Sequence, residues 1–301
     1  MNFYDKLKNI ISEEKIKEEE PMKLHTTFRI GGPAKYFVIP ETKEEVKEVV
    51  ACCKSEGMPY YILGNGSNLL VSDKGYEGVV IQIFKNMNQI TLEGDTITAQ
   101  AGAILSSVAN KALEAELTGF EFAAGIPGTL GGACVMNAGA YGGEMKDVLV
   151  NVVVLTQDGE FLTIPKEELE LGYRTSVIAK KNYIVLEATI KLTKGDKNAI
   201  KERMDELKVQ RTTKQPLEYP SAGSTFKRPV GHFAGKLIQD AGLRGFQVGG
   251  AQVSEKHCGF VINKDQATAA DVAELMKQVS AIVKEQFGVE LEAEVKRLGE
   301  F

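Results

Sequence analysis

The chain has 301 residues, of which 43% are hydrophobic and 26% charged, a composition typical of globular proteins that excludes a fibrous or disordered chain. Its length predicts two or three compact units rather than a single core. The formal net charge of −5 argues against a nucleic-acid partner, because that binding needs lysines and arginines to neutralise phosphates.

Hydrophobic periodicity and turn residues predict an alternation of helices and strands up to residue 192. An amphipathic helix over 42–56 begins with a capping box of Thr42 and Glu45, and a second helix covers 104–117. The turns Gly94-Asp95 and Asp158-Gly159 are predicted to close two hairpins. Eight segments are predicted to be strands: 60–63, 69–71, 79–84, 90–93, 96–100, 152–157, 160–164 and 183–192.

The C-terminal third has a second α+β pattern. A helix with Ile200, Met204 and Leu207 on one face starts near Gly195, where we place a domain boundary. Further elements are expected at 231–241, at 260–262, in a helix from Thr268 and in a closing strand over 289–295.

The N-terminus and the longest uncharged stretch bear on the location of the protein. Residues 1–20 alternate lysine with glutamate and lack the apolar core of a secretory signal. Residues 122–143 are uncharged over a membrane-spanning length, but their glycines, Pro127 and Asn137 would leave backbone polar groups unsatisfied in lipid. We therefore expect a cytoplasmic protein with no membrane partner.

Cysteines and histidines are few and scattered. The four cysteines form neither a disulfide framework nor a metal-ligand pair, so reduced and mostly buried thiols are expected: Cys52, Cys53, Cys134 and Cys258. The three histidines lack metal-ligand spacing and suit roles in turns or core hydrogen bonds: His25, His232 and His257. No metal site is predicted.

Two glycine-rich segments could line a ligand. The turn over 64–68 can present backbone N–H groups to a phosphate, although an ordinary tight turn is the commoner role of so short a motif. The segment over 119–143 contains eight of the thirty glycines, which favours close passage of a flat or charged ligand over a surface linker. Neither segment carries a Walker or Rossmann glycine pattern, so a dinucleotide would be held another way.

Motifs in a fixed order along nearly the whole chain identify a family resemblance. They include HTTFRIGGPA (25–34), GNGSNLL (64–70), AGIPGTLGG (124–132), GYRTS (172–176), AGSTFK (222–227), AGLRG (241–245), SEKHCGFVIN (254–263) and EV (294–295). Together they resemble UDP-N-acetylenolpyruvoylglucosamine reductase, which reduces the enolpyruvyl ether of UDP-N-acetylglucosamine to UDP-N-acetylmuramate in peptidoglycan synthesis.

This resemblance implies an α+β fold of the vanillyl-alcohol-oxidase type, with two FAD-binding subdomains over 1–72 and 73–195 and a substrate-binding domain over 196–301. It also implies non-covalent FAD, NADPH as the hydride-donating co-substrate and a UDP-sugar substrate, and a monomer is expected. Only 50 residues separate Arg174 from Ser224, too few for the tyrosine-bearing insert of the family's longer branch, so the chain resembles the shorter branch.

The cofactor residues follow from the resemblance. The turn over 64–68 would bind the FAD pyrophosphate through backbone amides, and residues 124–139 would wrap the flavin. The positions concerned are Gly64, Asn65, Gly66, Ser67, Asn68, Leu69, Gly125, Ile126, Pro127, Gly128, Thr129, Gly132, Ala133, Asn137 and Gly139.

The catalytic residues that the resemblance implies are Arg174, Ser224 and Glu294. Unaided, Arg174 would be assigned to a surface ion pair and Ser224 to a turn. Alternation over 289–295 predicts that Glu290, Glu292 and Glu294 share one solvated strand face, so only the terminal EV motif singles out Glu294.

Substrate-binding positions are Tyr173 by resemblance, with Tyr219, Lys227 and Arg228 as candidates for the diphosphate. A solvated basic loop is an equal alternative for the last two, and Arg228 stands where some relatives have Asn. Two other functions remain open at this stage: a flavin oxidase of the same fold, although the pyrophosphate turn offers no histidine for covalent FAD, and a flavin- or nucleotide-sugar-binding protein without catalysis.

Overall fold

The computed structural model describes residues 2–84 and 86–301, which divide into two compact units. Unit 1 comprises residues 1–17, 37–65 and 79–211, and unit 2 comprises 18–36, 66–78 and 212–301. Each unit is therefore assembled from three chain segments. The division into ranges 1–72, 73–195 and 196–301 stays a prediction.

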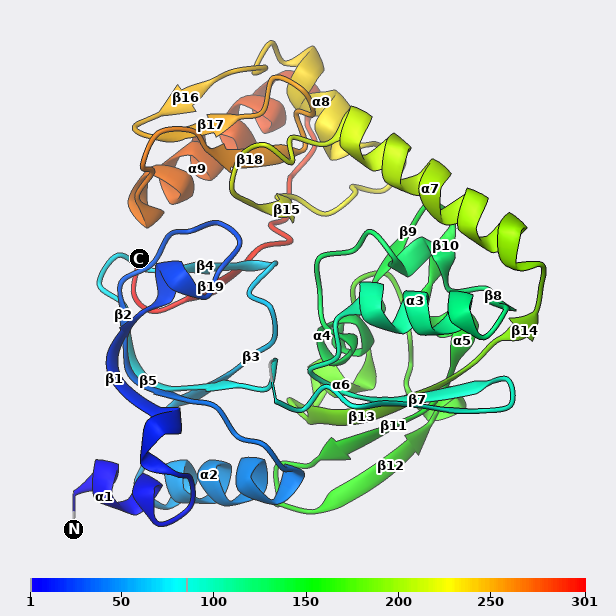
Figure 1. Cartoon of the computed structure of the whole chain (residues 1–301). Helices are drawn as coiled ribbons and strands as arrows, with labels where there is room; N and C mark the ends of the chain where they lie inside the picture. The colour runs from blue at the N-terminus through cyan, green and yellow to red at the C-terminus, as the bar shows by residue number, and fades with distance from the viewer. Residues whose placement is uncertain (1, 85) are drawn as a thin grey trace. The chain divides into compact units, whose positions relative to one another are not determined.

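The first sheet has the strand order β1-β2-β5-β3 (Figure 1). Its members are β1 (Ile16–Pro21), β2 (Pro33–Val38), β5 (Tyr76–Gln82) and β3 (Tyr60–Leu63). Strand β3 runs parallel to β5, with Tyr60 opposite Val79. The short helix α1 (Phe3–Lys8) precedes the sheet, and α2 (Lys43–Ser55) connects β2 to β3.

Helix α2 confirms the predicted amphipathic helix and buries Val46, Val49, Val50 and Cys53. The Thr42 hydroxyl caps it by accepting from the N–H of Glu45 at 3.1 Å. The Glu45 carboxylate, however, accepts from the N–H of Glu41 at 2.6 Å, one residue before the cap. The second hydrogen bond of the predicted capping box therefore comes from the N–H of Glu41 instead of the N–H of Thr42.

The larger sheet of unit 1 is antiparallel, with the order β12-β11-β13-β7-β6. Both predicted hairpins are confirmed, because β6 pairs with β7 and β11 pairs with β12. Helices α3 and α4 pack against β7, and α4 also packs against β13 (Figure 1). The bounds are β6 (Ile90–Glu93), β7 (Thr96–Gln100), β11 (Leu149–Leu155), β12 (Phe161–Pro165), β13 (Ile184–Lys191), α3 (Leu105–Glu114) and α4 (Leu130–Val135).

Short elements complete unit 1. Two small ladders pair β8 with β14 and β9 with β10, and α7 is the long helix predicted from Gly195, in which Ile200 and Leu207 are buried. Their bounds are β8 (Leu117–Thr118), β14 (Thr193–Lys194), β9 (Gly139–Ala140), β10 (Gly143–Glu144), α5 (Met145–Val148), α6 (Val177–Lys180) and α7 (Lys197–Lys214).

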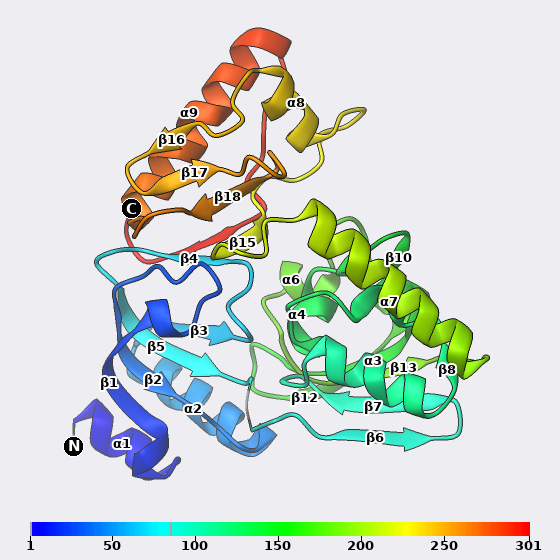
Figure 2. The ribbon, with the colours of Figure 1, turned by 45° about the horizontal axis from the view of Figure 1, so that its top comes forward.

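Unit 2 contains a four-stranded antiparallel sheet whose one side is covered by helices (Figure 2). Helix α9 packs on β16 and β17, and α8 packs on α9. A capping box of Thr268 and Asp271 starts α9, and Gly288, at φ 67°, ends it. The bounds are β15 (Ser221–Ser224), β18 (Phe260–Asn263), β17 (Ala251–Val253), β16 (Gln247–Val248), α8 (Ala234–Asp240) and α9 (Ala269–Phe287).

The predicted closing strand over 289–295 is wrong in position. The last strand is β19 (Lys296–Leu298), which pairs in parallel with β4 (Leu69–Val71). Residues 289–295 form a single isolated bridge, between Ala293 and Phe226. The segment is irregular, but its sequence alternates between apolar and polar residues because only some of its side chains pack against the core.

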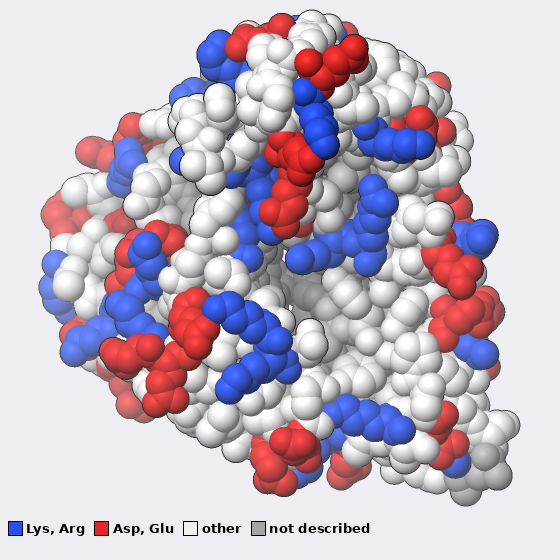
Figure 3. Space-filling model, turned by 180° about the vertical axis from the view of Figure 1, so that it is seen from behind, with Lys and Arg blue, Asp and Glu red and all other residues white. Residues whose placement is uncertain are grey.

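Two further features concern the surface. Every helix among the described residues is too short or too polar to cross a membrane. On the face drawn in Figure 3, lysines and arginines lie interspersed with aspartates and glutamates.

Candidate active site

The two glycine-rich segments approach each other inside unit 1. The Asn65 side chain donates from Nδ2 to the Pro127 carbonyl at 2.8 Å. A Cβ placed on Gly64 would lie 2.6 Å from the Thr129 hydroxyl oxygen, so only glycine allows this approach. The segments that the sequence assigned to one ligand therefore do have residues in contact.

The rest of the turn belongs to unit 2. Gly66 has φ 63°, and a Cβ there would lie 2.1 Å from the His25 carbonyl oxygen. Among the described residues, no acceptor pairs with the backbone N–H groups of Gly66, Ser67 and Asn68. A glycine turn with unpaired N–H groups is suited to binding an anion.

Part of the second glycine segment is exposed and could be reached by a ligand. Gly125, Pro127 and Gly132 are exposed, while Thr129 and Leu130 are buried. The Thr129 hydroxyl caps α4 by accepting from the N–H of Gly132 at 3.4 Å. Buried residues thus fix the segment, while Gly125 and Gly132 remain exposed.

Arg211 is a residue near this segment that the sequence did not single out. It lies in α7, and its Cδ would be 3.3 Å from a Cβ on Gly125. Burial lowers the pKa of Arg211 from its usual value, while the Tyr141 hydroxyl acts in the opposite direction. A guanidinium remains charged under such a shift, so it places a positive charge beside Gly125. In a helix rich in lysine and arginine, nothing in the sequence distinguished it.

Tyr173 and Arg174 form the tip of a tight turn in unit 1. Gly172 and Thr175 exchange backbone hydrogen bonds of 3.1 and 3.3 Å, which leaves the two predicted residues between them. Arg174 has φ 55°, and its guanidinium carbon lies 5.3 Å from the centroid of the Tyr173 ring. A non-glycine residue in this left-handed region carries a conformational cost, a feature often found at functional sites.

Ser224 and Glu294 lie on neighbouring segments of unit 2. The N–H of Glu294 donates to the Thr225 carbonyl at 2.8 Å, and the N–H of Lys227 donates to the Glu292 carbonyl at 2.8 Å. Ser224, at the end of β15, is exposed. The Asn68 side chain donates to the Glu294 carbonyl at 3.2 Å, which ties this pair to the glycine turn.

The three acidic side chains near the C-terminus do not share one face, contrary to the alternation. Glu294 is buried at 8% exposure, whereas the Glu292 side chain is 72% exposed and forms an ion pair with Lys227. Ala293, which a regular alternation would place on the face opposite the glutamates, is exposed. Because the segment pairs only at Ala293, no regular pleat extends through it, and burial distinguishes Glu294 from Glu292.

The candidate diphosphate residues each have a protein contact. Lys227 pairs with Glu292, and the Arg228 guanidinium carbon lies 4.7 Å from the Phe233 ring centroid. The Tyr219 hydroxyl accepts from the Lys264 ammonium at 2.6 Å. Their role in binding the diphosphate stays a prediction.

The cysteines and histidines are predicted to have structural rather than catalytic roles. All four cysteines are free, and burial raises the pKa of Cys53 and of Cys134 to about 12, so neither thiol is suited to act as a nucleophile. His25 pairs with Glu20 at 2.7 Å, while His257 accepts from the N–H of Gly259 at 3.1 Å and has its pKa lowered by burial. The described residues contain no group of three side chains that could hold a metal ion.

A cavity of about 540 Å³ opens elsewhere in unit 2. None of the predicted site residues lines it, although Lys264, the partner of Tyr219, does. Unit 1 holds the contacting residues of the two glycine segments and the Tyr173–Arg174 turn, and unit 2 holds Ser224 and Glu294.

Comparisons with known proteins identify the family of the chain. Residues 34–165 match the family described as FAD binding domain, and residues 215–298 match the C-terminal domain of UDP-N-acetylenolpyruvoylglucosamine reductase. The enzyme of that name from Agathobacter rectalis is 57% identical over 296 residues, covering 94% of each chain, and that from Lachnoclostridium phytofermentans is 56% identical over 298 residues, covering 98% of this chain and 96% of the relative.

A solved structure is similar over the same extent. The crystal structure of UDP-N-acetylenolpyruvylglucosamine reductase from Thermus caldophilus has a TM-score of 0.81 and 38% identity, covering 94% of this chain and all of the other. The matched FAD-binding domain and these relatives define an FAD-dependent oxidoreductase. More specifically, the chain belongs to the UDP-N-acetylenolpyruvoylglucosamine reductase family.

The residues present fit the cofactor that the family implies. Unpaired N–H groups at 66–68 are suited to a pyrophosphate, and the close approach of Gly64 to Thr129 leaves no room for a side chain between the two segments. The side-chain amides of Asn65, Asn68 and Asn137 are bound to protein atoms, so we expect the backbone, rather than these amides, to contact FAD.

Proposed function

We propose that this chain reduces UDP-N-acetylglucosamine enolpyruvate to UDP-N-acetylmuramate with NADPH, through non-covalent FAD, in peptidoglycan precursor synthesis. The observation that carries this proposal is the likeness of the whole chain, both matched domains included, to enzymes of that name. It favours the reductase over the flavin oxidase and over a binding protein without catalysis. We further propose that the protein acts as a monomer in the cytoplasm.

FAD would be held by the backbone of 64–69, by residues 125–129, 132–133 and 139, and at position 137 by the backbone alone, because the Asn137 side chain is bound to protein atoms. When bound, it supplies the redox chemistry that carries reducing equivalents from NADPH to the sugar. The chain's own residues position the substrate and manage its charge and its proton.

Arg174 is proposed to bind the carboxylate of the enolpyruvyl group. Reduction of that group moves negative charge into the carboxylate, and a guanidinium, which stays protonated, can donate to both oxygens. Its place at the tip of a two-residue turn supports this role, because the backbone hydrogen bonds of Gly172 and Thr175 hold the turn. Tyr173, 54% exposed beside it, is proposed as a substrate contact.

Ser224 is proposed to donate the proton that completes the reduction at the carbon bearing the carboxylate. A hydroxyl can act as a general acid when it is held within hydrogen-bonding reach of that carbon. Its exposure at the end of β15 supports access to substrate. Tyr219, Lys227 and Arg228 are proposed to contact the UDP diphosphate, for which their hydroxyl and cationic groups are suited.

Glu294 is proposed to assist polarisation of the substrate, and a matched pair of variants tests this. Glu294→Gln is expected to lower kcat by about 10- to 100-fold, since general acid-base groups contribute at least this much. Glu292→Gln removes an exposed carboxylate two residues away and is expected to leave kcat within about twofold, since solvated ion pairs contribute little.

The measurement is steady-state NADPH oxidation that depends on the enolpyruvyl sugar. Equal losses in the two variants, or a loss confined to Glu292→Gln, would reject Glu294 as the functional carboxylate. Retained FAD absorbance in both variants controls for loss of cofactor.

A further inference from the structure

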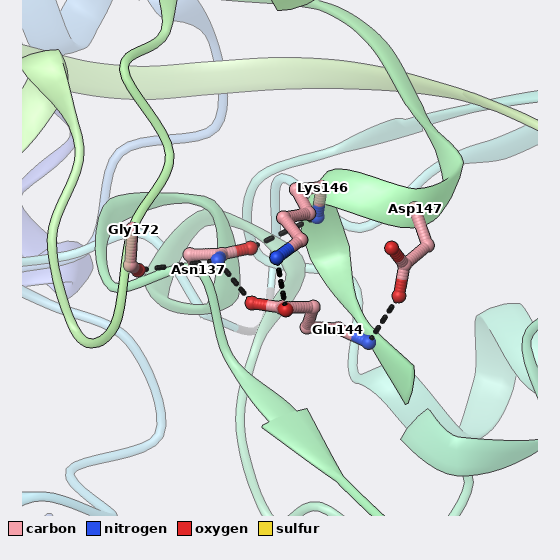
Figure 4. Close-up of polar contacts among 5 residues, drawn as sticks. All are labelled: Asn137, Glu144, Lys146, Asp147 and Gly172. Carbon is pink, nitrogen blue, oxygen red and sulfur yellow. Dashed lines mark hydrogen bonds and ion pairs between the residues drawn. The ribbon is translucent and has the colours of Figure 1, made fainter. Parts of the chain in front are cut away.

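We propose that Asn137 is a positioning residue that holds the Tyr173–Arg174 turn for the reaction with the sugar. This inference rests on the proposed function, because it assigns Asn137 a role through Arg174. It concerns the Asn137 side chain, which is turned to Gly172, whereas the proposed contact of residue 137 with FAD is through the backbone (Figure 4).

The Asn137 side chain makes three hydrogen bonds in a buried setting. Its Nδ2 donates to the Gly172 carbonyl at 3.1 Å and to the Glu144 carboxylate at 2.5 Å, and its Oδ1 accepts from the Lys146 N–H at 2.9 Å (Figure 4). The residue is 2% exposed and has φ 44°. Both amide protons are therefore used within the protein.

The partners determine the orientation of the amide. A carboxylate and a carbonyl can only accept, and a backbone N–H can only donate, so rotating the amide by half a turn would break all three bonds. Glu144 is itself fixed, because its N–H donates to Asp147 at 2.9 Å and its carboxylate pairs with the Lys146 ammonium at 2.5 Å. Glu144 and the Lys146 N–H therefore fix the Asn137 amide, which in turn binds the Gly172 carbonyl at the start of the turn.

The Tyr173–Arg174 turn is hydrogen-bonded to the second glycine segment on both sides. Asn137 binds Gly172 just before Tyr173, and the Ser176 hydroxyl donates to the Val135 carbonyl at 2.6 Å just after Thr175. Val135 is the last residue of α4 and lies two residues before Asn137. Asn137 thus fixes the Gly172 carbonyl, two residues before Arg174 with its left-handed backbone. A misplacement of a substrate-binding group by about 1 Å is enough to lower the rate about 100-fold.

An alanine at position 137 would separate positioning from cofactor binding. Asn137→Ala is expected to keep FAD and to be reduced by NADPH within about twofold of the wild-type rate. Reoxidation of its flavin by the enolpyruvyl sugar is expected to slow by about 10- to 100-fold. In an Arg174→Ala background, the same change is expected to add less than about threefold, because residues that act through one another are not additive.

Asn182→Ala serves as the matched control. Asn182 has a similar left-handed backbone, at φ 51°, in the same unit, but is exposed, so both half-reactions should stay at wild-type rates. Glu144→Gln keeps an acceptor for Asn137 and is expected to give a smaller loss of the same kind. It provides the test if Asn137→Ala does not fold, as judged by circular dichroism.

Amide hydrogen exchange gives a readout that does not depend on activity. Faster exchange of the peptide over 172–176 in Asn137→Ala than in Asn182→Ala supports the proposal. Loss of FAD, equal slowing of both half-reactions, additivity with Arg174→Ala or unchanged exchange over 172–176 would each overturn it. Failure of the wild-type protein to react with the sugar would instead reject the proposed function, while the exchange result would still decide whether Asn137 holds the turn.

Discussion

Replacing Ser224 by alanine is expected to lower kcat for the enolpyruvyl sugar by about 10²- to 10⁴-fold, the usual contribution of a positioned general acid. The side chain is exposed, so its loss should leave folding unchanged. Reduction of the bound flavin by NADPH should keep its wild-type rate, because no proton has to reach the sugar in that half of the cycle. Stopped-flow absorbance resolves the two halves.

A cysteine at position 224 supplies the control. A thiol can also donate a proton and is close in size to the hydroxyl, so Ser224→Cys should recover part of the rate that Ser224→Ala loses. A Ser224→Ala enzyme that turns over at the wild-type rate would remove Ser224 from the chemistry. Equal slowing of both half-reactions would indicate a disturbed flavin site instead.

Removing the guanidinium of Arg174 is expected to have an effect of similar size. Arg174→Ala should lower kcat/KM for the sugar by about 10²- to 10³-fold, which is typical for the loss of one group that stabilises developing negative charge. Alanine occupies the same left-handed backbone, at φ 55°, with the same penalty as other non-glycine residues, so the loss reflects the side chain. Steady-state kinetics over a range of sugar concentrations gives the value.

Lysine separates charge from geometry at this position. Arg174→Lys keeps the positive charge but loses the planar fork, so it should fall between the wild type and Arg174→Ala. An Arg174→Ala protein with unchanged kcat/KM would show that another cation meets the carboxylate. Arg211, the guanidinium beside Gly125, would then be the first candidate.

Much of the fold could be predicted from the sequence because its elements are locally determined. The apolar spacing of α2 and α9 and the turn at Gly94-Asp95 each indicate structure without distant contacts, and all three are confirmed. The closing strand could not be placed this way. Its true position, β19, is set by parallel pairing with β4, more than two hundred residues away in the sequence.

The candidate site was visible in the sequence only through its motifs. Two contacts that give those motifs a physical meaning depend on distant residues: Gly64 against Thr129, and Asn137 against Gly172. The burial of Glu294 was hidden for a further reason, because alternation suggested a solvated face that the irregular segment does not form. Arg211 had no motif and no periodicity to mark it.

The most direct test of the proposed function follows the flavin through one complete cycle without oxygen. The purified protein is expected to be yellow, to lose its absorbance near the flavin maximum when NADPH is added, and to regain it when UDP-N-acetylglucosamine enolpyruvate follows. A protein that carries no flavin, or a reduced flavin that the enolpyruvyl sugar does not reoxidise, would contradict the account.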